Sequence, residues 1–105
     1  MDNAAIAEMF AALGEVAIRR MFGGKGVYTG GKIIAVEVAE EILLKADTQS
    51  APTFEAAGSR QWTYDGKNGP VKMPYWSIPA EAFDDPDEMA RWVRLAAEAA
   101  MRAAK

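Results

Sequence analysis

Residues 27–38 read VYTGGKIIAVEV and predict a β-hairpin. Two runs of strand-forming residues flank Gly30-Gly31, and both glycines can take the positive φ angles that a two-residue hairpin turn requires. On either side, residues 15–22 and 41–46 predict two more strands, which join the hairpin through turns at 23–26 and 39–40. Because parallel strands need long crossover connections, four strands with such short connections indicate an antiparallel meander.

Helices are predicted before and after this meander. Apolar residues at i, i+3, i+4 and i+7 predict a helix over 4–13, which Asp2 or Asn3 can cap. A short helix is expected over about 51–57. The last helix has the clearest start, since Asp85-Pro86-Asp87-Glu88 supplies an N-cap, a first-turn proline and an early glutamate. Its apolar side is made of Met89, Trp92, Val93, Ala96, Ala97, Ala100, Ala103 and Ala104.

Two later strands complete the predicted sheet. Residues 61–64 and 71–78 read as strands around a loop at 65–69, and Pro74 suggests that the second strand is an edge strand or contains a bulge. The order is helix, four strands, short helix, two strands, long helix. This order predicts an α+β fold, with an antiparallel sheet of about five to six strands and helices on one face. At 105 residues we expect one domain over 1–105.

Composition narrows the possible chemistry. The chain has no cysteine and no histidine, which excludes disulfides, thiolate or imidazole metal sites, and Ser–His–Asp or Cys–His nucleophiles. We therefore expect no catalytic residues, no cofactor and no metal, and a protein that is not an enzyme. A net charge of −3 without a basic half argues against direct binding to nucleic acid. Neither a signal peptide nor a membrane span is visible, so a cytoplasmic protein is expected.

A family resemblance agrees with this interpretation. Arg19-Arg20-Met21-Phe22-Gly23-Gly24, followed by Gly26-Val27-Tyr28, resembles the signature of the TfoX/Sxy N-terminal domain family. The rest of the chain agrees in order, at Leu44-Lys45, residues 54–59, Trp62-Thr63-Tyr64, Met73-Pro74-Tyr75-Trp76, Ile78-Pro79 and Asp85-Pro86. Leu43 departs from the family, which often places a tyrosine there.

The resemblance implies an α+β domain similar to secretion chaperones and kinship with bacterial regulators of natural competence, the uptake of DNA in transformation. It implies no catalytic residues. The larger regulators add a C-terminal helical domain that these 105 residues do not contain, so direct action on a promoter is not expected.

The glycine-rich segment beside this signature invites two interpretations. A phosphate-binding loop needs Gly-x-x-x-x-Gly-Lys-Ser/Thr at the start of a helix, whereas Lys25 is followed by Gly26 and a strand. A hairpin turn is therefore favoured, although its backbone amides could form a weak anion nest. Arg19 and Arg20 precede it on a predicted strand and should point to opposite faces. A structural carboxylate or carbonyl partner is favoured for the inward arginine, and contact with an acidic partner protein is the alternative.

Aromatic residues gather in the later strands. Trp62, Tyr64, Tyr75 and Trp76 could form a stacking platform for single-stranded nucleic acid or an interface hot spot. The favoured interpretation places Trp62 and Trp76 in the core under the last helix, together with Trp92. Lys45 could be a buried reactive amine, but the apolar residues beside it share the other face, so it should point to solvent. The acidic cluster at 84–88 is explained by helix capping.

The leading hypothesis is a non-enzymatic regulatory or adaptor domain that acts by protein–protein interaction. We expect its partner-binding residues at Arg19, Arg20, Gly23, Gly24, Tyr28, Lys45 and Tyr75. The sequence does not identify the partner protein, and a homodimer through an open sheet edge is possible. The alternative function is that of a weak nucleic-acid-binding transcriptional regulator.

Overall fold

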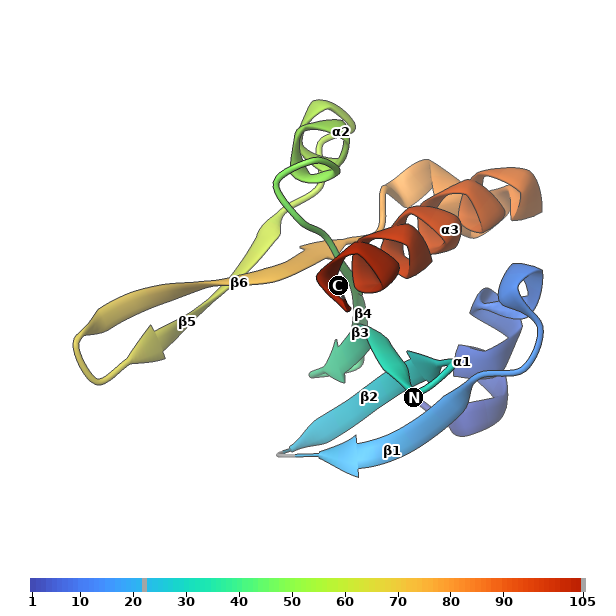
Figure 1. Cartoon of the computed structure of the whole chain (residues 1–105), viewed down its shortest axis with the longest axis horizontal. Coiled ribbons are helices and arrows are strands. Elements are labelled where there is room, and N and C mark those ends of the chain that lie inside the picture. The colour runs from blue at the N-terminus through green and yellow to red at the C-terminus, as the bar shows by residue number, and fades with distance from the viewer. Residues whose placement is uncertain (22, 105) are drawn as a thin grey trace.

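A computed structural model describes residues 1–21 and 23–104. It contains one six-stranded antiparallel sheet in the order β1-β2-β3-β4-β6-β5, with the helices gathered on one face (Figure 1). This confirms the predicted α+β fold. The elements are α1 (Asn3–Met9), the 3-10 helix η1 (Ala11–Leu13), β1 (Ala17–Met21), β2 (Gly24–Thr29), β3 (Lys32–Val38), β4 (Glu41–Lys45), α2 (Ala51–Ala56), β5 (Gln61–Gly66), β6 (Gly69–Ser77), the 3-10 helix η2 (Ala80–Asp84) and α3 (Pro86–Ala103).

The N-terminal helix is shorter than predicted. Asp2 caps α1, since its carboxylate accepts a hydrogen bond of 2.8 Å from the amide of Ala5. The α-helix ends at Phe10, whose amide bonds to Ala7 three residues back, and a separate 3-10 turn follows. Phe10 and Ile6 are both fully buried. Their spacing of four residues places both side chains on one side of the helix, so the predicted apolar face is confirmed at these two positions although the α-helix itself is shorter.

The meander follows the prediction at its second turn and differs at its first. Gly30 and Gly31 both have positive φ, which confirms the two-residue hairpin. The predicted turn at 23–26 is confirmed at Gly23 but is wrong for residues 24–26, because β2 already begins at Gly24 and pairs with both β1 and β3. A Cβ on Gly24 would overlap the carbonyl oxygen of Glu37, so this glycine permits close strand approach instead of a turn. Phe22, which was predicted to end the first strand, lies outside the described residues.

The turn between β3 and β4 is made without glycine. Ala39 and Glu40 have φ angles of 52° and 66°, a conformation that costs energy for residues with a Cβ. The Glu37 carboxylate offsets part of this cost by accepting a hydrogen bond of 2.9 Å from the Glu40 amide. The predicted turn at 39–40 is confirmed, and the Glu37 side chain stabilises its backbone geometry.

The β5–β6 hairpin is longer than predicted. Both strands extend into the expected loop at 65–69 and leave a turn at 67–68. Pro74 lies in a bulge, because Gln61 pairs with Trp76 but Thr63 pairs with Lys72, which leaves two extra residues on β6. The bulge that Pro74 suggested is therefore confirmed. An edge position is wrong, since β6 lies between β4 and β5.

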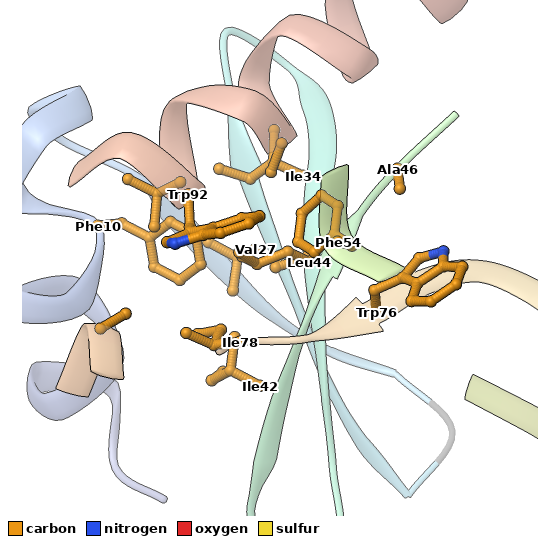
Figure 2. Close-up of a cluster of buried hydrophobic side chains, with 14 of the residues drawn as sticks. Phe10, Val27, Ile34, Ile42, Leu44, Ala46, Phe54, Trp76, Ile78 and Trp92 are labelled. Carbon is orange, nitrogen blue, oxygen red and sulfur yellow. The ribbon is translucent and has the colours of Figure 1, made fainter. Parts of the chain in front are cut away.

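The main core lies between the sheet and α3. Asp85 caps α3 through the amides of Asp87 and Glu88, as predicted. Trp92 is fully buried beside Phe54, which also packs against Trp76 (Figure 2). The predicted apolar side of α3 is buried in its middle, but Ala103 and Ala104 are exposed. Among the helices that the structure describes, none is long and apolar enough to cross a membrane.

Candidate functional site

The sheet face opposite the helices carries a second apolar cluster. We call it the open face, because the helices pack on the other side. Val36, Leu43 and Tyr75 are only 5%, 2% and 8% exposed there. They are covered by half-buried side chains from three strands, namely Ile33, Val38, Trp62 and Met73. The sheet thus seals part of its open face with its own side chains.

Trp62 belongs to this cluster and not to the core under α3, so that part of the prediction is wrong. Its ring centroid lies 6.0 Å from that of Tyr64 and 6.4 Å from that of Tyr75. Trp62 and Trp76 are on opposite faces because Gln61 pairs with Trp76 and Trp62 is the next residue along β5, where successive side chains alternate. Trp76 does lie in the main core, as predicted.

A hollow of about 210 Å³ opens beside this cluster. We call it the open-face hollow, and it is lined by Met21, Gly24, Lys25, Val36, Glu37, Val38, Trp62, Met73 and Tyr75. Met21 comes from β1 and Trp62 from β5, the two strands at opposite ends of the sheet order. Since both line one hollow, the sheet must curve, and the open face is concave. Burial, and secondarily the nearby Tyr28, raises the pKa of Tyr75, so its phenol stays neutral.

Arg19 and Arg20 point to opposite faces, as predicted. The guanidinium of Arg19 lies 5.3 Å from the ring centroid of Tyr28 on the open face. Arg20 lies on the helix side, where it lines a hollow together with Ile18 and Lys25. Within residues 1–21 and 23–104, neither arginine forms an ion pair or hydrogen bond, so the expected structural partner of the inward arginine is not found.

The polar groups around Arg20 are already engaged with one another. The ammonium of Lys25 donates to the carbonyl of Met1 at 2.7 Å and to the side chain of Asn3 at 2.8 Å. The N-terminal ammonium pairs with the Glu40 carboxylate. Gly24 and Gly26 lie in strand ladders on both sides, so the weak anion nest predicted for this segment does not form. Gly23, with a φ of 68°, is the turn glycine.

The family model described as TfoX N-terminal domain matches residues 8–100. The chain belongs to the TfoX N-terminal domain family. No curated protein matches the chain.

In this TfoX N-terminal domain, the described residues of the first motif that carried the resemblance lie at one corner of the sheet. The segment Arg19–Met21 forms most of β1, and Gly24 begins the neighbouring strand. Two of these residues belong to the open-face hollow, because Met21 lines it and Gly24, which also lines it, brings β2 close to β3.

The predicted partner-binding residues share the open face only in part. Arg19, Tyr28, Lys45 and Tyr75 lie on it, and Lys45 sits opposite Tyr75 across the β4–β6 ladder. This confirms that Lys45 points away from the neighbouring core residues. Arg20 lies on the helix side and Gly23 in the turn. Among the described residues no group of three acidic side chains is placed to hold a metal ion.

Several residues of the hollow were missed from the sequence. Val36, Val38 and Met73 were assigned to strands but to no site. The signal was present in β3, whose nearly continuous apolar run is typical of a strand covered on both faces.

Proposed function

We propose that this TfoX N-terminal domain is a non-enzymatic regulatory or adaptor domain that binds another protein through its open face. The observation that carries the proposal is the open-face hollow, an apolar concavity on the side of the sheet that the helices leave uncovered. Cavities of roughly 150 Å³ accept a benzene ring. A hollow of about 210 Å³ is therefore large enough for one aromatic or branched aliphatic side chain of a partner.

The composition of this surface supports protein binding. Interfaces are enriched in tryptophan, tyrosine, methionine and arginine, and their hot spots occupy well-packed pockets. Trp62, Met73 and Tyr75 line the hollow, and Arg19 and Tyr28 extend the same face toward β1. The chain contains no histidine or cysteine, and the tyrosine in the hollow has a raised pKa, which makes it a poor general base. These features favour an adaptor over an enzyme.

The family supplies the context of the proposal. Kinship with the regulators of natural competence supports a regulatory role in bacterial DNA transformation, carried out in the cytoplasm. In that role the domain would recruit a protein partner, and a separate component would contact DNA.

The test first captures the protein that binds in the open-face hollow and then measures its affinity when the hollow is filled. A photoreactive amino acid at Val38 would capture whatever occupies the hollow in nuclease-treated native lysate, and the same group at the exposed Glu98 on α3 would report background. The captured protein, once purified, should bind the domain and lose at least about tenfold in affinity when Val38→Trp fills the hollow. Val71→Trp, on the exposed part of β6, is the matched control. Equal affinity in both variants would refute the proposal.

A second candidate function rests on the aromatic series of the open face. Trp62 lies within stacking range of Tyr64 and Tyr75, and Lys45 sits opposite Tyr75. Such an arrangement supports weak binding of single-stranded nucleic acid by a transcriptional regulator. An oligothymidylate should then bind at low salt and lose affinity steeply as salt rises. Absence of binding at low salt would end this alternative.

A further inference from the structure

Among the described residues, no strand pairs with the outer edge of β1. β1 is the first strand in the sheet order and pairs only with β2 (Figure 1). Four of its five residues are exposed, and Ile18 is half-buried. An edge strand presents a row of unpaired backbone donors and acceptors, which another strand can complete. The outer edge of β1 can therefore pair with a strand from another molecule.

The charges on this edge determine which strand can bind. Arg19 projects on the open face and Arg20 on the helix side, and β1 contains no acidic residue. The nearby carboxylates have other partners: Asp2 accepts from the Ala5 amide, and Glu40 pairs with the N-terminal ammonium. An incoming strand would thus meet one arginine on each of its faces. Opposite charges across a strand pair stabilise it and like charges destabilise it.

A second copy of the chain fits this edge poorly. In a two-fold antiparallel pairing of β1 with itself, a register centred on Arg19 places that residue opposite its own copy. Moving the centre to the next bond places Arg19 opposite Arg20 of the other copy. Both of these registers bring like charges together, and a register centred between Ile18 and Arg19 places each arginine opposite an apolar residue, so the edge favours an acidic strand over its own copy.

The flanks leave room for an added strand. Beside the first half of β1, a hollow of about 910 Å³ is lined mainly by small residues, including Ala7, Ala11 and Gly14. Only Glu15, just before the strand, adds negative charge on this side. The opposite edge of the sheet differs, because β5 carries Asp65 and no basic residue.

We propose that the β1 edge binds an extended acidic segment of a partner protein by strand addition. The register of β1 makes the recognition specific. Two consecutive acidic residues face Arg19 and Arg20, and β-branched residues beside them face Ile18 and Met21. This inference rests on the proposed protein-binding function and adds the chemistry of the partner.

The probe is the capped peptide Thr-Val-Glu-Glu-Val-Thr, whose symmetric sequence suits either strand direction. It is titrated into the ¹⁵N-labelled full chain, and amide shifts are followed by NMR. We expect the largest shifts in β1 and a weaker response from Thr-Val-Lys-Lys-Val-Thr. The double variant Arg19→Glu/Arg20→Glu should lose about tenfold in affinity for the acidic peptide and gain affinity for the lysine peptide, because the charge pattern is reversed. Lys67→Glu/Lys72→Glu, with the same charge change on the exposed hairpin, is the matched control.

Four outcomes would overturn the inference. These are no shift in β1 at millimolar peptide, equal binding of both peptides, stronger competition at β1 by an oligothymidylate, or concentration-dependent self-association through β1 without peptide. The Val38→Trp variant separates this inference from the proposed function, since it fills the open-face hollow and should leave peptide binding intact. If the peptide fails while the hollow still captures a partner, only the strand-addition inference is wrong.

Discussion

The two faces of the sheet are closed by different means. On the covered face, three helices and the sheet enclose one large cluster that contains fully buried residues such as Phe54 and Trp92. On the open face, the buried cluster among residues 1–21 and 23–104 consists of Val36, Leu43 and Tyr75, and half-buried side chains of the same sheet cover them. The difference indicates that the covered face contributes most of the buried core, whereas the open face leaves a partly exposed apolar hollow.

The largest effect is expected from Leu44→Ala. Leu44 is fully buried on the covered face, where surrounding helices restrict collapse of the cavity that the substitution leaves. We expect the free energy of unfolding to fall by about 4 kcal/mol. Urea denaturation of the variant measures this loss, with Phe83→Ala on the exposed 3-10 helix as the control that should change little. A loss below that of the open-face substitution Leu43→Ala would contradict the comparison.

The next largest loss of stability is expected from a substitution of Gly24, which begins β2. A Cβ at this position overlaps the backbone of Glu37, and strands joined on both sides have little freedom to move apart. Gly24→Ala should therefore cost about 3 kcal/mol, at the upper end of the range for overpacking. Gly58→Ala is the matched control, because its φ of 84° is strained for alanine but its Cβ would meet open space. We expect about 1 kcal/mol there. Equal losses would show that close strand approach is not the reason for Gly24.

A smaller loss is expected from Leu43→Ala on the open face. Leu43 is almost as buried as Leu44 and adjacent to it, but its cover consists of side chains that can move into the space. We expect about 2 kcal/mol, at the low end for such substitutions. The same variant should also reduce partner binding at the open-face hollow, because the packing under Tyr75 loosens. Intact partner binding together with a full core-sized loss of stability would show that this face is an ordinary core.

The sequence was sufficient for the order of elements and for most of the turns. Gly30-Gly31 and Asp85-Pro86 each carry a local signal that depends only on their own backbone preferences. The family resemblance is confirmed by the family model, which matches residues 8–100. Turns and helix starts of this kind are determined by residues that are adjacent in the sequence.

Two kinds of feature required the three-dimensional structure. The role of Gly24 depends on a strand thirteen residues away, and the face of Trp62 depends on the register of β5 against β6. The open-face hollow depends on curvature that brings Met21 near Trp62. Spacing along the chain contains no information about such long-range geometry, so residues 24–26 of the glycine turn and the position of Trp62 were predicted wrongly.

The smallest loss of stability is expected from removing the ion pair between Arg102, near the end of α3, and Asp47. Arg102 donates to both carboxylate oxygens of Asp47, with N–O distances of 2.6 and 3.0 Å, and this contact holds the pKa of that carboxyl well below its usual range. A lowered pKa in the folded state stabilises the fold above the unfolded value of about 3.9 and loses its effect as pH falls through the folded value. Wild type should therefore melt at a higher temperature than Arg102→Gln at pH 7.

The pH dependence distinguishes the ion pair from packing by the arginine stem. The difference in melting temperature between wild type and Arg102→Gln should stay constant down to about pH 5 and shrink below about pH 4, because protonation of Asp47 removes the pair in wild type. Arg94→Gln, an exposed change on the same helix, should show little difference at any pH. A difference that persists unchanged at pH 2 would mean that Arg102 holds the end of α3 through apolar contacts of its side chain. In that case, apolar packing alone would hold α3 on the covered face, including its last turn around Arg102.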